Sequence, residues 1–554
     1  MNADTRPELS AVRAATPPRG VLPAISGLLI SMLLASLDQT IVGTALPRIV
    51  AELNGLDRYS WLITGYLVAS TVIVPIAGKL GDLFGRKPFL IAGMIGFVAA
   101  SALCGIAQDM TQLIVFRIIQ GLFGGMLFAS AFTVLGDIYS PAERARIQGL
   151  FGGVFGLSSI VGPVVGGFLT DNLGWRWVFY VNLPVGLFGV LVVAAFLPFV
   201  RTKASWRDID FVGSAALAAG LIPVLVALSV AKDQGWTSVE VLGLLGFGVA
   251  MLVAFFVIER RVKEPIVPFQ LFKNRAFAVS MVVGFFAALG MFGMIIFIPL
   301  ETQGVLGVSV TNSGLLLTPM MFGLIVASVL TGNLIPRIKH YHYLGTIGIV
   351  LVMAGMYLVA QTTTSTPQSA ITFAIVLVGL GVGATMPLYI NAVQSALPVR
   401  YLGVGTSQIQ FWRNVGGTVS SAVLGSILAQ RLPGAIADQI AGVNLPPAFT
   451  KAIGSSASNP NALLDPAKIA AAKAKLPSQL TPLFDQAMHA VRDALALTLH
   501  DTFLIAVALA GIALIASLFM PDVPLRARQL RRQEPAFGEV RASPEAAERD
   551  AAVG

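Results

Sequence analysis

Long apolar stretches separated by short polar segments recur along the whole chain. A helix of about 20 residues crosses the hydrocarbon core of a bilayer. We predict fourteen such spans, at about 21–46, 59–78, 88–107, 111–136, 147–170, 177–199, 211–230, 239–259, 277–300, 314–333, 342–360, 370–391, 403–428 and 500–520. The pattern therefore predicts an all-α polytopic membrane protein.

Composition agrees with this class and excludes a soluble enzyme. The chain has 554 residues, of which 12% are charged, and its mean hydropathy is +0.79. Segment 1–20 is polar and contains prolines and arginines, so we expect a tail and no cleavable signal peptide.

The basic charge indicates topology and not a nucleic-acid partner. The sequence pI is about 9.7, but most of the 37 Lys and Arg residues lie in loops on the same side as the N-terminus. Loops rich in Lys and Arg stay in the cytoplasm. We therefore expect a multi-pass protein of the cell (plasma or inner) membrane with both termini cytoplasmic.

One carboxylate interrupts the first apolar stretch. Asp38 lies within Ser31–Pro47, roughly 20 Å beyond Ile25 along a helix, and so still inside the hydrocarbon. A charge there costs at least about 2.5 kcal/mol, which makes Asp38 a functional candidate. The alternative is a structural carboxylate that a neighbouring helix end stabilises.

Metal and cofactor chemistry find little support in the sequence. Cys104 is the only cysteine and sits in an apolar stretch, so disulfides and Cys metal sites are excluded. The four histidines form no ligand pattern, and we expect His340 and His342 to be a solvated loop pair. A phosphate-binding G-x-x-x-x-G-K-[ST] sequence is absent, so no ATP, metal or other cofactor is expected.

The connection between the second and third spans is the strongest motif, GKLGDLFGRK from Gly78 to Lys87. Gly78 and Gly85 permit a tight turn between helices. Asp82 can accept hydrogen bonds from a helix N-terminus or from an arginine, and Arg86 marks the cytoplasmic side together with Lys87.

The fourth and fifth spans carry two further patterns. Arg117, in FRIIQGLFGG, is a guanidinium at membrane depth that needs an anion or several carbonyls; bracing helix ends is the alternative. The fifth span contains Gly153, Gly156, Gly162, Pro163, Gly166 and Gly167. Small residues at spacings of three and four allow close helix contact, and Pro163 adds a weak point. Plain close packing would give the same pattern.

Together these motifs resemble the signatures of the major facilitator superfamily. The 78–87 loop resembles its most specific signature, the Arg117 element its R-x-x-Q-G sequence, and the fifth span the element typical of antiporters. LDQTIVGTALP, which ends at Pro47, and WRWVFYVNLP, from Trp175, resemble the fourteen-span drug:proton antiporter branch of multidrug exporters. That branch often has Asn where this chain has Gly43.

The resemblance implies two six-helix bundles and two inserted helices. The expected segments are an N-terminal tail (1–20), an N-terminal bundle (21–200), two inserted helices (201–263), a C-terminal bundle (264–520, with an external loop at 430–499) and a cytoplasmic tail (521–554). It also implies that Gly78, Asp82, Gly85, Arg86 and Lys87 form a conformational-switch loop.

We expect Asp38 and Arg117 to pair, because Asp38 is the only carboxylate well inside the N-terminal half. The predicted cavity-lining residues are Gln39, Tyr66, Gln120, Asn391, Gln394 and Gln410, with Gln408, Arg413 and Asn414 as further polar candidates. Glu301 is either a second acidic site or an exposed external carboxylate. Snorkelling at a helix end is the alternative for Arg413.

The long segment 430–499 contains Phe484, Met488, Val491, Leu495 and Leu499 at helical spacing. We expect an amphipathic helix over 482–499 that lies on the outer leaflet or covers the exit.

The sequence favours a proton-coupled antiporter that exports amphipathic, cationic drugs or toxic compounds by alternating access, as a monomer. The alternative is an exporter of a lipid, glycolipid or other metabolite, which the long external loop would suit. An integral membrane enzyme would need a cluster of catalytic groups that the sequence lacks.

Overall fold

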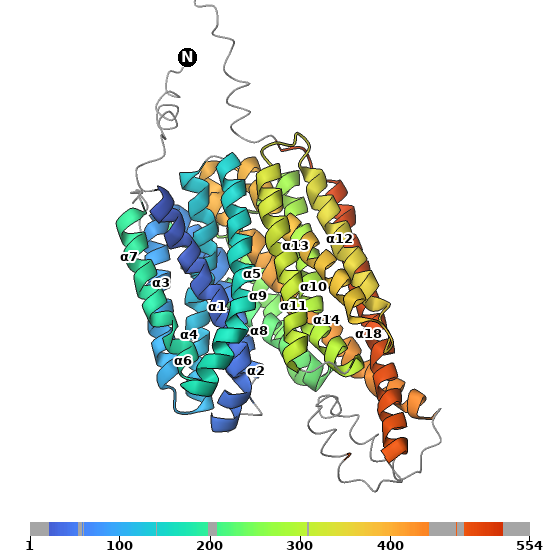
Figure 1. The fold of residues 1–554 in the computed structure, drawn as a ribbon. Coiled ribbons are helices and arrows are strands. Elements are labelled where there is room, and N and C mark those ends of the chain that lie inside the picture. The colour runs from blue at the N-terminus through green and yellow to red at the C-terminus, as the bar shows by residue number, and fades with distance from the viewer. Residues whose placement is uncertain are drawn as a thin grey trace, which may run out of the picture.

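The computed structural model describes residues 21–53, 58, 60–139, 141–197, 208–306, 310–441, 473 and 481–523. Every regular element in these ranges is helical, and Figure 1 shows long, roughly parallel helices. Thirteen of the described helices are long and apolar enough to cross a membrane. The predicted all-α membrane fold is therefore confirmed.

The first group of helices packs within itself. It comprises α1 (Val21–Leu53), α2 (Ser60–Phe84), α3 (Arg86–Ile106), α4 (Met110–Ile138), α5 (Pro141–Asn172), α6 (Trp177–Tyr180) and α7 (Asn182–Phe196). Helix α4 packs on α2 and α3, and α1 packs on α5 and α7. Figure 1 shows this group in blue and teal at the left.

The second group lies at the right of Figure 1. It comprises α10 (Arg275–Leu300), a π-helical turn η3 (Glu301–Val305), α11 (Val310–Leu334), α12 (His342–Ala360), α13 (Gln368–Ala396), α14 (Leu402–Ala441) and α18 (Thr481–Leu518). Short 3₁₀ turns, η2 (Phe269–Lys273) and η4 (Val399–Tyr401), precede α10 and α14. Helices α11 and α12 pack on α13, and α10 packs on α14 and α18.

Helices α8 (Phe211–Gln234) and α9 (Val239–Glu259) form a pair between the two groups in sequence. Helix α8 contacts α2 of the first group and α14 of the second. Helix α9 packs on α8 and leaves large apolar side chains such as Phe247 and Val253 exposed. This exposed face is what a lipid-facing helix presents.

Helix α14 is a further long helix beside these thirteen candidate spans, and it is less apolar than they are. Its first half carries Gln408, Gln410, Arg413 and Asn414, which lower its mean hydropathy. Because α14 packs on α10 and α18 of its own group and also on α2 and α8, a polar helix can still occupy this position.

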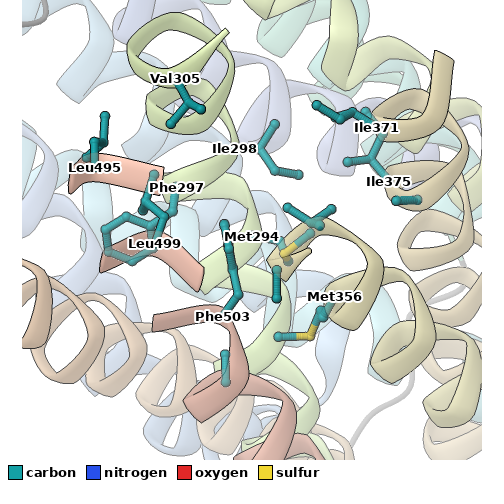
Figure 2. Packing of buried hydrophobic residues seen from close by; sticks show 14 of the residues in the cluster. Met294, Phe297, Ile298, Val305, Met356, Ile371, Ile375, Leu495, Leu499 and Phe503 are labelled. Atoms are coloured by element: carbon teal, nitrogen blue, oxygen red, sulfur yellow. The ribbon is translucent and has the colours of Figure 1, made fainter. Parts of the chain in front are cut away.

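The segment 430–499 differs from its prediction. Helix α14 continues to Ala441 and α18 already begins at Thr481, so both ends of the predicted loop are helical; most of 442–480 lies outside the described residues. Leu495 and Leu499 are buried against α10, and Figure 2 shows them beside Phe297 and Phe503. The apolar face was predicted correctly, but it packs on protein and continues directly into the last span.

Helix α5 is the structural link between the two groups. Gly162 and Gly166 face α1: an added Cβ would lie 2.0 Å from Thr40 Oγ1 and 2.3 Å from Thr44 Oγ1, respectively. Nearer the start of α5, a Cβ on Gly156 would lie 2.6 Å from Ile325 Cγ1 on α11. The small residues of α5 therefore serve two different contacts, whereas an added Cβ on Gly167 would have nothing within 4 Å.

The buried position of α18 yields a stability test. Leu499→Ala should lower the melting temperature of the detergent-purified protein, since comparable core truncations cost about 2–5 kcal/mol. Leu497 is 54% exposed on the same helix, so Leu497→Ala is the matched control and should melt like wild type. Equal melting temperatures for the two variants would contradict the packing of α18.

A second matched pair tests the α1–α5 contact. Gly162→Ala should lower the melting temperature, because Thr40 Oγ1 and Cβ occupy the space and overpacking costs about 1–3 kcal/mol. Gly167→Ala should leave it unchanged or slightly raised, since alanine favours the helix. The contact would be refuted if Gly162→Ala were tolerated as well as Gly167→Ala.

Candidate functional site: a buried ion pair and the interface between the helix groups

Glycines in α4 bring α2 close enough to cover Arg117. An added Cβ on Gly121 or Gly125 would lie 2.4 Å from the Tyr66 or Ser70 carbonyl oxygen of α2. Only glycine permits this approach of the two backbones. As a result, the Arg117 guanidinium lies over the Tyr66 ring at 4.4 Å from its centroid, a cation–π contact.

Asp38 and Arg117 form a completely buried ion pair, as the sequence predicted. Arg117 Nη1 donates to Asp38 Oδ2 at 2.6 Å and to Gln120 Oε1 at 2.5 Å. Gln120 Nε2 in turn donates to Asp38 Oδ1 at 2.9 Å. Asp38 is 0% and Arg117 2% exposed.

Two further residues that sequence analysis did not assign to the site complete this cluster. Asn182 Nδ2, at the start of α7, donates to Asp38 Oδ1 at 2.8 Å. Ser101 Oγ of α3 accepts from Gln120 Nε2 at 2.6 Å and from Asn182 at 3.3 Å. The signal that could have revealed Asn182 was an amide within an apolar span.

The cluster thus holds Asp38 with donors from α4 and α7, while α2 and α3 hold those donors. A buried pair is costly to break on one side, because the remaining charge is left without a partner. Protonation of Asp38 would remove its charge attraction for Arg117, whereas the carbonyl oxygen of the protonated group could still accept from Gln120.

Asp82 links the first helix group to the N-terminus of α14. Its two carboxylate oxygens accept from the backbone N–H groups of Gly403 and Val404, both at 2.9 Å. Arg86 Nη2 also donates to Asp82 at 2.7 Å, and Arg86 bonds the Thr133 carbonyl of α4. A carboxylate at a helix N-terminus is stabilised by unpaired N–H groups and by the helix dipole.

The glycines of the 78–87 loop permit this contact. A Cβ on Gly78 would lie 2.2 Å from Ser407 Oγ, and Gly85 has a positive φ of 87° between α2 and α3. Lys87 Nζ donates to the Ala194 carbonyl at 2.8 Å. All five residues predicted for this loop therefore lie at the same end of the two groups.

The polar residues predicted for a cavity fall into separate environments. Gln394 and Asn391 of α13 are fully buried at the contact with α5, where both hydrogen-bond Gln148, at 3.0 and 3.3 Å. Gln410 donates to Asn414 at 2.9 Å on α14. Gln39 is partly exposed next to Asp38. Gln39, Tyr66 and Gln120 thus lie at or next to the ion pair, whereas the α13 residues join the two groups.

Glu301 belongs to the second helix group, at the junction of α10 and η3. It is 1% exposed and accepts a hydrogen bond from the Thr362 hydroxyl. The alternative of an exposed carboxylate is therefore excluded.

The histidine prediction needs correction. His340 and His342 are not merely solvated, because their Nδ1 atoms hydrogen-bond the two oxygens of Asp522 at 2.7 and 2.6 Å. Partial burial raises the pKa of Asp522, but these two hydrogen bonds outweigh it and hold that pKa below its usual value. The ligand atoms lie within 4.8 Å of one another, a spacing that could hold a divalent ion.

Comparison with known proteins places this geometry in a family. Residues 28–421 match the model described as Major Facilitator Superfamily. The chain is 37% identical to "Multidrug transporter protein MdtP" of Bacillus subtilis (strain 168), over 92% of this chain and 95% of that protein. It is 30% identical to "Tetracenomycin C resistance and export protein" of Streptomyces glaucescens, over 80% and 84%.

A solved structure agrees at the level of fold. The human organic anion transporter MFSD10 superposes with a TM-score of 0.57 at 14% identity, covering 88% of this chain and 99% of that one. Because the family model matches most of the chain and the relatives are named as a multidrug transporter and an export protein, the protein is a multi-pass membrane transporter that belongs to the major facilitator superfamily.

Proposed function

We propose that the protein is a proton-coupled antiporter that exports amphipathic, cationic compounds from the cytoplasm across the cell membrane. The buried Asp38–Arg117 pair carries this proposal, because a fully enclosed carboxylate in a transporter has few other uses. The relatives named for multidrug transport and for tetracenomycin C export support the substrate class.

Asp38 would bind a proton and a cationic substrate in turn. In the described state the carboxylate accepts from three side chains, those of Arg117, Gln120 and Asn182. A proton on Asp38 removes its attraction for Arg117, so the α1–α4 contact loosens. Loss of that proton restores the carboxylate, which a substrate cation or Arg117 can then neutralise.

The contact between the helix groups would transmit this change. Helix α5 touches α1 beside Thr40, two residues beyond Asp38, and touches α11 at its other half. At the end of the two groups where α14 begins, Asp82 holds α2 against α14. Rocking of the two groups about α5 would open one side of the molecule while it closes the other, which is alternating access.

The proton gradient is a sufficient energy source. One proton moving through 100 mV provides about 2.3 kcal/mol. One pH unit adds about 1.4 kcal/mol. For one substrate without net charge per proton, the sum supports a concentration ratio of several hundred. One-for-one exchange with a monovalent cation moves no net charge, so only the pH gradient contributes and the ratio is about tenfold.

The lipid or metabolite alternative rested on a long external loop and a mostly apolar cavity. Both ends of that loop belong to α14 and α18, which shortens it. The relatives named for multidrug transport and for tetracenomycin C export favour drug export over this alternative.

Ethidium efflux from energised cells tests the role of Asp38. Asp38→Asn should abolish efflux, because the amide cannot exchange a proton or pair with Arg117, and a protonophore should stop efflux by the wild type. Asp171→Asn, an exposed carboxylate at the end of α5, is the matched control and should transport normally. Undiminished efflux by Asp38→Asn at equal expression would refute the proposed role.

The Asp82 contact predicts a change in accessibility. In a single-cysteine background (Cys104→Ala, Ser407→Cys), position 407 is buried between α2 and α14 and should react slowly with N-ethylmaleimide. Asp82→Asn should accelerate labelling about tenfold, since charge-assisted hydrogen bonds contribute about 1.5–3 kcal/mol.

Asp109→Asn serves as the control for this measurement, because Asp109 is an exposed cap at the start of α4. It should leave labelling at position 407 unchanged. If Asp82→Asn also leaves the labelling rate unchanged, Asp82 does not hold this end closed.

A further inference from the structure

Arg413 is a cation without a partner among the described residues of the second helix group. It lies eleven residues after Leu402, the first residue of α14, which is about 16 Å along the helix. Among the described residues it has no hydrogen bond or ion pair, whereas Arg117 in the first group has both. Among the described residues, the membrane-depth arginine of the first group is therefore paired, whereas that of the second group is not.

The Arg413 side chain lines a small cavity between α10, α12, α13 and α14. The cavity has a volume of about 30 Å³, and its other walls include Met291, Val352, Thr385 and Met386. Among the described residues that line it, Arg413 alone is charged. The Thr385 hydroxyl donates to the Val382 carbonyl, so it supplies no counterion.

Gly284 of α10 contributes to the space beside Arg413. An added Cβ there would lie 3.5 Å from Arg413 Cγ, which is ordinary contact. The volume of the cavity is enough for one or two water molecules or for a small anionic group.

Snorkelling does not explain this position. The start of α14 is covered by Asp82 at Gly403 and Val404, and Arg413 faces other helices of its group at the cavity. Arginine keeps its charge in proteins, so it cannot relieve the cost of desolvation by losing a proton. Arg413 is only partly buried, so an anion can reach its guanidinium, and the described part of the protein provides no partner for this charge.

We propose that Arg413 is an anion-recognition subsite, which binds the acidic group of a transported amphiphile. This rests on the proposed export function and extends its substrates to zwitterionic amphiphiles, whose cationic group would pair at Asp38 or remain in water. A guanidinium fork suits the two oxygens of a carboxylate. A free inorganic anion such as chloride carries the same negative charge and is the alternative occupant of this site.

A stability measurement tests the anion site without transport. The purified protein should melt at a higher temperature in sodium acetate or sodium chloride than in sodium gluconate at equal ionic strength, because the hydroxyl groups beside the gluconate carboxylate would lose water against the apolar walls of the cavity. Arg413→Gln should lose this difference and melt at least as high as wild type in gluconate, since it removes an unpaired charge. Arg260→Gln, an exposed arginine at the end of α9, should behave like wild type.

A matched pair of dyes identifies the source of the anion. Rhodamine 110 carries a free carboxylate, and rhodamine 123 is its methyl ester. If the substrate supplies the anion, Arg413→Gln should weaken binding of rhodamine 110 at least tenfold in fluorescence anisotropy and leave rhodamine 123 unchanged, with Arg413→Lys intermediate. If the site binds chloride instead, chloride should stabilise wild type more than Arg413→Gln. The substitution should then leave the affinity for each of the two dyes unchanged.

The inference is overturned if no anion stabilises wild type relative to Arg413→Gln and the dyes show no difference. It is also overturned if Arg413→Gln melts well below wild type in gluconate, which would make Arg413 a structural brace. Because both measurements are at equilibrium, failure of proton coupling would leave them unaffected. An Asp38→Asn protein should still discriminate the two dyes.

Discussion

The structure depends on the cost of holding charge away from water. Asp38 and Arg117 are both excluded from solvent, and each is tolerable only while the other is beside it. Three further helices contribute to this requirement: α2 covers the guanidinium with Tyr66, while Ser101 of α3 and Asn182 of α7 complete the hydrogen bonds. The glycines of α4 and α5 then follow as the residues that let these helices approach.

The same logic extends to the contact between the helix groups. Asp82 accepts hydrogen bonds at the N-terminus of α14, and Gln148 hydrogen-bonds the side-chain amides of α13. These polar contacts between the two groups can be broken and made again, and they lie beside the apolar contact of α5 with α11. A purely apolar contact between the groups would lack such a switch, because lipid tails are as apolar as the side chains and no hydrogen bond would be broken or formed. Helix α5 is central, since it touches both α1 near the ion pair and α11 across the interface.

Sequence reasoning predicted the fold and the ion pair for simple reasons. Spans are visible in hydropathy alone, and opposite charges at membrane depth have few possible partners. Asn182 was missed because its contact with Asp38 depends on how α7 packs, 144 residues away in the chain. Helical periodicity revealed the apolar face of α18 but could not distinguish a lipid surface from a protein surface, so Leu499 was assigned to the wrong environment. Periodicity also could not show which helix Gln394 faces, so its hydrogen bond with Gln148 of α5 was not predicted.

The central claim is that proton and substrate compete for Asp38. The most direct measurement is proton release from purified protein in weakly buffered detergent, followed with a pH indicator as ethidium is added. The account predicts that ethidium releases protons from wild type, with a yield that falls as the starting pH rises, and that Asp38→Asn binds ethidium more weakly and releases none. Ethidium binding to wild type with no proton release, or equal release from Asp38→Asn, would contradict it.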